Sequence, residues 1–202
     1  MNMNIKNFKL VNSPAKQNSP DNQKLLGDAP SGALFLESED GVDWYIAQKL
    51  FADDTVKIQY DSSGVIVAVV DKPLPQRGNT YAASALWPVN CSVAEMSVED
   101  YPAITPDGTW KYDAEAQTVY QDTDLIADNS LARNTRLRGQ YAATAALNIA
   151  TLQAGIASDR SVEGDSDALT AWQGYLCDLR AMTTDDLQQS PAEFPTAPVS
   201  IF

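Results

Sequence analysis

The chain has 202 residues, of which 44% are hydrophobic and 20% charged, a composition typical of globular proteins and not of disordered or fibrous ones. Its 14 Lys and Arg against 27 Asp and Glu give a formal net charge of −13, the opposite of a nucleic-acid-binding surface, so we expect no nucleic-acid partner. The absence of histidine excludes imidazole as a catalytic base, metal ligand or pH switch. No apolar run is long enough to span a membrane, so we expect a soluble, cytoplasmic protein with no membrane partner.

The first thirty residues are expected to form a flexible arm. Residues 1–30 contain six Asn and three Pro, with only one short apolar stretch, at residues 8–11. The two cysteines, Cys91 and Cys177, lie far apart in the sequence and have no other metal-ligating residue types beside them. They are therefore expected to be reduced, buried thiols and not part of a metal cluster.

Residues 31–125 are predicted to form a β-rich domain of short antiparallel strands. Alternating or continuous apolar runs flank turn residues in three places, which predicts hairpins over residues 33–46, 55–70 and 110–120. The Pro-rich segment between the last two hairpins, residues 71–109, is expected to be mainly loop, with at most short strands near residues 87–96.

Beyond residue 130 the apolar spacing changes to that of α-helices, which predicts one helix over 130–157 and a second over 165–182. The first is expected to begin at a cap formed by Asn129 or Ser130, and the two to pack as an antiparallel hairpin over residues 130–185. Residues 186–202 contain three Pro and are expected to form an extended tail whose apolar side chains can dock on an apolar surface. The predicted fold class is α+β: a β-rich amino-terminal domain followed by a carboxy-terminal helical hairpin.

The sequence contains no convincing catalytic, metal or cofactor site. The acidic residues at 159–167, with Gly164, resemble the spacing of a calcium-binding EF-hand loop, but Thr170 stands where that loop requires a bidentate Glu. A solvated turn capped by Ser161 or Asp165 explains these residues better. Adjacent acidic pairs lie at expected turns, and the phosphate-binding, dinucleotide-binding and hydrolase motifs are missing. We therefore expect no enzymatic activity and no cofactor.

Aromatic residues are concentrated in the β-rich half of the sequence, as is common in protein interfaces. Most should pack in the core or in turns, but a subset is a candidate partner-binding face. Trp172, by contrast, falls in the apolar stripe of the second helix and is expected to be core. The candidate partner-binding residues are Trp44, Tyr45, Tyr60, Trp110 and Tyr112.

Several short patterns, in order along the chain, resemble the tail fibre assembly proteins of tailed bacteriophages. The resemblance covers roughly residues 33–70 and 107–199. In the first half it rests on SEDGVDWY at 38–45, FADD at 51–54, TVKIQYD at 55–61 and VIVA at 65–68. In the second half it rests on DGTW at 107–110, LQA at 152–154, Leu169-x-Ala171-Trp172-x-x-Tyr175-x-x-x-Leu179 and Phe194-Pro195-x-x-Pro198.

This resemblance implies a chaperone that binds the distal, carboxy-terminal part of a trimeric tail fibre and promotes its folding and trimerisation. It implies that residues 31–125 bind the fibre, that the protein acts in the host cytoplasm during phage assembly, and that it can remain on the fibre tip. It transfers no catalytic residue. Two questions stay open: whether the helical hairpin self-associates or braces the β domain, and whether the protein is instead a virion adhesin that contacts host surface polysaccharide.

Overall fold

The computed structural model describes residues 3–12, 20, 23–24, 27 and 32–199. The chain divides into two compact units, which we call the β unit, Met1–Asp122, and the helical unit, Thr123–Phe202.

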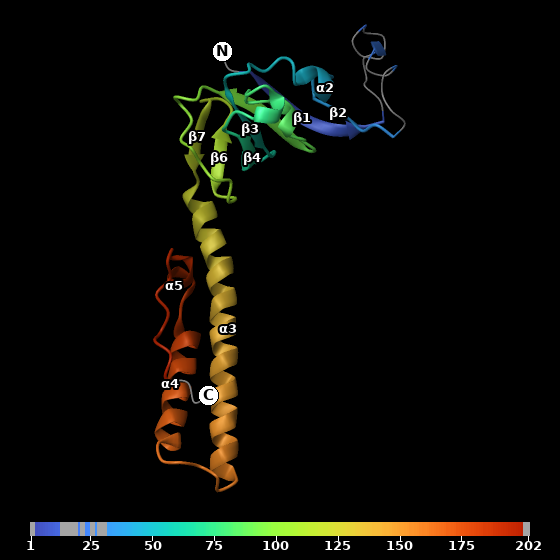
Figure 1. Ribbon diagram of the computed structural model, residues 1–202. Coiled ribbons are helices and arrows are strands. Elements are labelled where there is room, and N and C mark those ends of the chain that lie inside the picture. Colours follow the sequence, from blue (N-terminus) through green and yellow to red (C-terminus); the bar gives the residue numbers. More distant parts are fainter. Residues whose placement is uncertain (1–2, 13–19, 21–22, 25–26, 28–31, 200–202) are drawn as a thin grey trace. The chain divides into compact units, whose positions relative to one another are not determined.

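Within the described residues, five antiparallel strands form the main sheet of the β unit, in the spatial order β2-β1-β5-β3-β4 (Figure 1). The middle strand, β5, pairs with β1 on one side and with β3 on the other. The two edges are formed by β2 and β4. The strands are β1 (Asn4–Val11), β2 (Phe35–Glu37), β3 (Val56–Tyr60), β4 (Ile66–Val70) and β5 (Cys91–Met96).

Each face of the sheet carries its own core. Side chains alternate along β3, so that Val56, Ile58 and Tyr60 share one face and the residues between them lie on the other. The first face packs against a separate two-stranded hairpin, β6 (Trp110–Asp113) and β7 (Thr118–Gln121). The opposite core includes Phe8, Leu36, Trp44, Phe51 and Val93, with side chains from the short helix α2 (Trp44–Ala47) and the 3-10 turn η2 (Ala83–Ala85).

Two of the three predicted hairpins are confirmed. β3 and β4 pair around the turn at residues 61–65, and β6 pairs with β7. In the first turn the N–H of Tyr112 donates to the carbonyl of Gly64, 2.8 Å away. A Cβ at residue 64 would lie 3.1 Å from the carbonyl oxygen of Tyr112, and the φ of Gly64 is +84°, so glycine is needed at this close approach.

The expectation of a loose arm is wrong for residues 4–11, which form β1 between β2 and β5. Ile5 and Phe8 are buried in the core, and a register shift between them accommodates Asn7, whose φ is +54°. The Asn-rich composition predicted a loop, but asparagine tolerates the left-handed backbone conformation of a bulge and can form hydrogen bonds within a strand. Most of the remaining arm, to residue 30, lies outside the described residues.

The first predicted hairpin, 33–46, is half right. Its first strand is β2, but residues 44–47 form the helical turn α2 and not a second strand. Asp43 begins this turn, because its side chain accepts a hydrogen bond from the N–H of Tyr45 at 2.8 Å. In the segment expected to be mainly loop, β5 is a six-residue strand, buried throughout, at the centre of the sheet.

The helical unit consists of α3 (Thr123–Ala157), α4 (Asp165–Ala181) and α5 (Thr184–Gln188). The two predicted helices are confirmed, and Figure 1 shows them side by side in antiparallel directions. The helix α3 begins at Thr123, so the predicted cap at Asn129 or Ser130 is wrong and Ser130 is buried inside the helix. Gly164, and neither Ser161 nor Asp165, occupies the cap position of α4.

The carboxy-terminal segment is not extended throughout, because α5 was not predicted. Its capping box joins Thr183 and Asp186, and its Leu187 is buried. Asn134 of α3 donates from Nδ2 to the carbonyls of Leu187 and Gln189, at 2.8 and 3.0 Å. After α5 the chain lacks regular structure, and Phe194 packs edge-on against Tyr141 with ring centres 5.2 Å apart, in the core that contains Trp172.

Candidate partner-binding surface

Three of the five aromatic residues predicted to bind a partner are core residues. Trp44 is fully buried: its ring packs against those of Phe8 and Phe51, and its Nε1 donates to the carbonyl of Leu86 at 3.2 Å. Tyr60 and Tyr112 are also buried, and their ring centres lie 5.0 Å apart on the opposite face of the sheet. Because these rings are covered by the protein's own side chains, each stabilises the core in which it lies and is not available to a partner.

The structure therefore brings Tyr60 and Tyr112 together but separates both from Trp44. The Tyr60 hydroxyl donates to Oδ1 of Asn4 at 2.9 Å. The Tyr112 hydroxyl has no hydrogen-bond partner in the described part of the chain, and burial, followed by the nearby Tyr60, raises the pKa of Tyr112 to about 12. Trp110 is half-buried beside the same core.

Tyr45 is the exposed member of the predicted set, because helix geometry turns it away from the core. Successive residues of a helix point about 100° apart, so when Trp44 and Ala47 face inward Tyr45 faces outward. Asp43 fixes this turn from a fully buried position. Burial raises the pKa of the Asp43 carboxyl, against hydrogen bonds from the N–H groups of Tyr45 and Ile46 that lower it.

An exposed patch forms around Tyr45, and we call Leu34, Phe35, Tyr45 and Trp87 the aromatic patch. The Tyr45 ring centre lies 6.1 Å from those of both Phe35 and Trp87. The Tyr45 hydroxyl donates to the carbonyl of Leu34 at 3.2 Å. Tyr45 is 37% and Trp87 38% exposed, while Phe35 is buried beneath them. The patch thus presents rigid, partly exposed aromatic rings, which is typical of binding hot spots.

Trp87 was not among the predicted binding residues. It lies in the irregular segment between β4 and β5, where no strand or helix period marks it. Its position in a Pro-rich loop is the signal that could have found it, because loops lie at the surface and carry much of the binding function of proteins.

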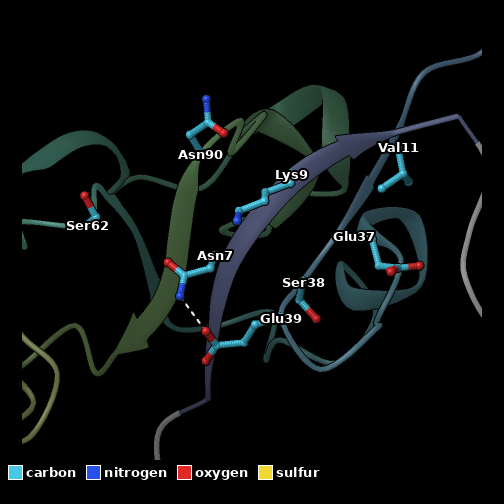
Figure 2. Close-up of a pocket in the computed structure, with 8 residues that line it drawn as sticks. All are labelled: Asn7, Lys9, Val11, Glu37, Ser38, Glu39, Ser62 and Asn90. Carbon is cyan, nitrogen blue, oxygen red and sulfur yellow. Dashed lines mark hydrogen bonds between the residues drawn. The ribbon is translucent and has the colours of Figure 1, made fainter.

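A groove of about 540 Å³, lined mainly by polar residues, is shown in Figure 2. Val11 of β1 lines the groove and pairs with Phe35 of β2, which belongs to the patch. Lys9 stands opposite Glu37 in the same pair of strands, and Asn7 donates from Nδ2 to Oε2 of Glu39. The residues that line the groove are Asn7, Lys9, Val11, Glu37, Ser38, Glu39, Ser62 and Asn90. Its amides, hydroxyls and charges of both signs suit a hydroxyl-rich or otherwise polar ligand.

The exposed surface of α3 is unusually poor in charge. The twenty residues from 139 to 158 include no Asp, Glu, Lys or Arg. On the side of α3 away from α4, Leu147 is 62% exposed and is followed by the exposed Ala150 and Ala154. An outward helix face normally carries charged residues, so this surface is suited to contact with another protein.

Within the described residues, no group of three or more His, Cys, Asp or Glu side chains is placed to hold a metal ion. Among the helices that the structure describes, none combines the length and apolarity needed to cross a membrane. Of the two cysteines, Cys91 is buried and Cys177, expected to be buried, is exposed, and both are free thiols.

Comparison with known proteins finds sequence similarity to one protein family. Residues 47–199 match the family model described as "Caudovirales tail fibre assembly protein, lambda gpK". Tail fiber assembly protein U of Escherichia phage Mu is 25% identical over 178 residues, covering 86% of this chain and 89% of that protein. Protein U' of the same phage is 27% identical over 173 residues, covering 81% and 84% of the two chains. The probable tail fiber assembly protein of Escherichia phage P2 is 26% identical over 147 residues, covering 70% and 74%.

Proposed function

This chain belongs to the Caudovirales tail fibre assembly protein family, and we propose that it acts as a chaperone for the distal, carboxy-terminal part of a trimeric tail fibre. The family resemblance inferred from the sequence is confirmed. A role in phage tail fibre assembly follows from this membership, and the family is not a class of enzymes. The single observation that carries the proposal is the match over residues 47–199, which includes parts of both units.

In this proposal the fibre contact lies on the β unit, at the aromatic patch. Tyr45 keeps the role predicted for it, Trp87 joins it, and the buried Trp44 supports the surface from within. The patch covers apolar surface or unpaired strand edges on the unfinished fibre until the trimer closes, which suppresses wrong pairings between fibre chains. This step takes place in the host cytoplasm, where phage proteins are made and assembled.

Co-expression with the distal fragment of the tail fibre, followed by size-exclusion chromatography with mass detection, tests the assembly role. A soluble trimeric fragment obtained only with this protein supports it, and co-elution shows that the protein stays on the fibre. A fragment that trimerises equally well alone contradicts it.

Substitutions in the patch locate the contact. We expect Tyr45→Ala and Trp87→Ala each to weaken fibre binding about tenfold, the size of an aromatic hot spot. Tyr120→Ala is the matched control, because Tyr120 is 45% exposed on β7, outside the patch. Equal affinities for all three variants would move the contact elsewhere on the protein.

For the helical unit we propose self-association through the uncharged face of α3, with a second copy of this chain as the occupant. Because each copy carries a net charge of −13, copies repel one another over most of their surface, but not at residues 139–158. Leu147→Glu should shift the mass distribution toward the monomer, and Gln173→Glu on the exposed side of α4 should not. An unchanged mass for Leu147→Glu would favour the alternative, that the hairpin only braces its own chain.

The polar groove favours a second candidate function, an adhesin that binds host surface polysaccharide. Saccharide sites combine aromatic rings with amide and carboxylate groups, and here the groove and the aromatic patch are joined through Val11 and Phe35. This role requires the protein on purified virions at the fibre tip and binding of the isolated protein to host polysaccharide. If the protein is absent from virions or does not bind host polysaccharide, the adhesin hypothesis fails, while the proposed assembly role is unaffected.

A further inference from the structure

The strand β4 is an edge of the main sheet, and its pairing with β3 is interrupted once, by a bulge at Val67. It pairs with β3 on one side, and within the described residues Ile66–Val70 pairs with no strand on the other. The hairpin β6–β7 shields only its beginning, through the bridge between Val65 and Lys111. Natural sheets usually protect an edge with Lys, Pro, a very short strand, a bulge or a cover. Of these, β4 has the bulge at Val67, and beyond it Ala68–Val70 pair with β3 in regular register.

The sequence of this edge favours strand pairing. From residue 64 to residue 70 the chain reads GVIVAVV, with no charge and no Pro. Val67, in the middle, is 47% exposed. Exposed, uncharged runs of β-branched residues on an edge strand are the segments most prone to pair with a strand of another chain. In this protein the net charge of −13 comes from residues outside the run and favours solubility despite the exposed edge.

The backbone groups offered by β4 can be assigned from its partner strand. The N–H of Asp61 donates to the carbonyl of Val65 at 2.9 Å, so Asp61 directs its backbone toward β4. Because this direction alternates along a strand, Gln59 and Lys57 also face β4, where they pair with Ala68 and Val70. The intervening Val69 therefore directs its N–H and C=O away from β3, toward the unpaired side.

We infer that β4 is a docking edge to which an extended segment of the tail fibre adds as a further strand. This inference rests on the proposed function and adds a second contact with the fibre, at the edge of the sheet opposite β2 and its aromatic patch. Strand addition obtains affinity from backbone hydrogen bonds, so it accepts segments of varied sequence, and the side chain of Val67 provides an apolar contact.

Charge indicates what the added segment looks like and argues against a second copy of this chain. Asp61 lies in the turn before β4 and Asp71 directly follows it, but Lys111 and Lys72 lie beside these two acids. The negative charge therefore comes from the β unit as a whole, which has nine Lys and Arg against seventeen Asp and Glu. A neutral fibre strand flanked by Lys or Arg is attracted to this edge. A second β unit brings the same acids and the same net charge of −8, and is repelled.

The test compares Val69→Pro with Val69→Ala in the full chain, measuring the Kd for the purified distal fragment of the tail fibre. Both changes trim the same side chain, which packs against the core, but only proline removes the outward N–H and blocks the added strand. We expect Val69→Pro to raise the Kd at least tenfold relative to Val69→Ala. A second pair of variants serves if Val69→Pro disturbs folding. Val67→Lys places a charge on the edge and should block the added strand, whereas Val67→Thr keeps the edge uncharged and should leave binding intact.

The outcomes separate the inference from the function on which it rests. Loss of affinity in Val69→Pro and Val67→Lys, together with slower amide exchange of Val69 in the wild-type complex, supports strand addition. Wild-type binding that both variants retain overturns the docking edge and leaves the assembly role intact. A wild-type protein that does not bind or assist the fibre fails the proposed function and this inference with it. A wild-type dimer that Val69→Pro dissociates without fibre assigns the edge to a second copy and overturns the fibre as its occupant.

Discussion

Trp44 and Tyr45 are neighbours in sequence, and the structure predicts that their truncation has opposite consequences. Trp44→Ala removes a fully buried ring from between Phe8 and Phe51 and leaves the carbonyl of Leu86 without its Nε1 donor. Burial of about 200 Å² of aromatic surface at about 25 cal/mol/Å² is worth about 5 kcal/mol. The measured range for Trp→Ala in cores is about 3 to 5 kcal/mol, so we expect a loss near 4 kcal/mol. Tyr45→Ala should cost much less, about 1 kcal/mol, because the ring is 37% exposed and its truncation removes only the contacts with Phe35 and Trp87.

Urea titration followed by two-dimensional NMR measures these losses, because it reports the β unit and the helical unit separately. The expected result is that Trp44→Ala strongly lowers the urea midpoint of the β unit alone, whereas Tyr45→Ala lowers it only slightly and weakens fibre binding. A fall of less than 1 kcal/mol for Trp44→Ala, combined with a loss of fibre affinity, would refute the assignment of Trp44 to the core and return it to the binding face predicted from the sequence.

Three further predictions concern buried polar groups. Because burial holds the pKa of Asp43 above its usual 3.8, the native state prefers the protonated acid: its contribution to stability is full below pH 3.8 and is lost as the pH rises through the folded-state pKa. Asp43→Asn should therefore gain stability relative to wild type between pH 3 and 7, seen as a rising difference in urea midpoints; a constant difference contradicts this. Glu95 accepts hydrogen bonds from the N–H groups of Met3 and Ala52 at 3.0 and 2.9 Å and lies beside the buried Lys57, so Glu95→Gln should cost about 3 kcal/mol. Removing Lys57 as well, as Lys57→Met, should cost less than the sum of the two single losses in the same titration. Asn134→Ala should cost about 1 to 3 kcal/mol in the helical unit and speed amide exchange in α5, because two carbonyls lose their donor.

Sequence reasoning succeeded where the evidence for an element is local. The run TVKIQY, the turn at residues 61–64 and the apolar run after it are sufficient to predict β3 and β4, and the 3.6-residue spacing predicts α3 and α4. The strand β1 failed because its evidence is distant: the N–H groups of Met3 and Asn7 find Glu95 and Ser92, about ninety residues away in the sequence. No pattern within residues 1–30 contains that information.

The candidate site failed for a different reason. Trp44 and Tyr45 cannot share a face in either a strand or a helix, because adjacent side chains point in different directions in both. The sequence therefore predicts that one of the two lies on a partner-binding surface, but it does not identify which one. The contacts of Trp44 with Phe8 and Phe51 in the folded protein show that Trp44 faces inward. Trp87 joins Tyr45 across more than forty residues of irregular chain, which no local pattern predicts.

The place of β1 in the sheet has a consequence for how the protein is made. On the ribosome β1 emerges before every other described strand, yet it cannot occupy its position until β5, which ends at Met96, has been synthesised. At about 5 to 20 residues per second, the interval between the two strands is several seconds, much longer than a hairpin needs to form. Throughout that interval β1 can pair with β2, but its side toward β5 has no partner. The unit that we propose protects fibre strands from wrong partners therefore first exposes a strand of its own to the same risk.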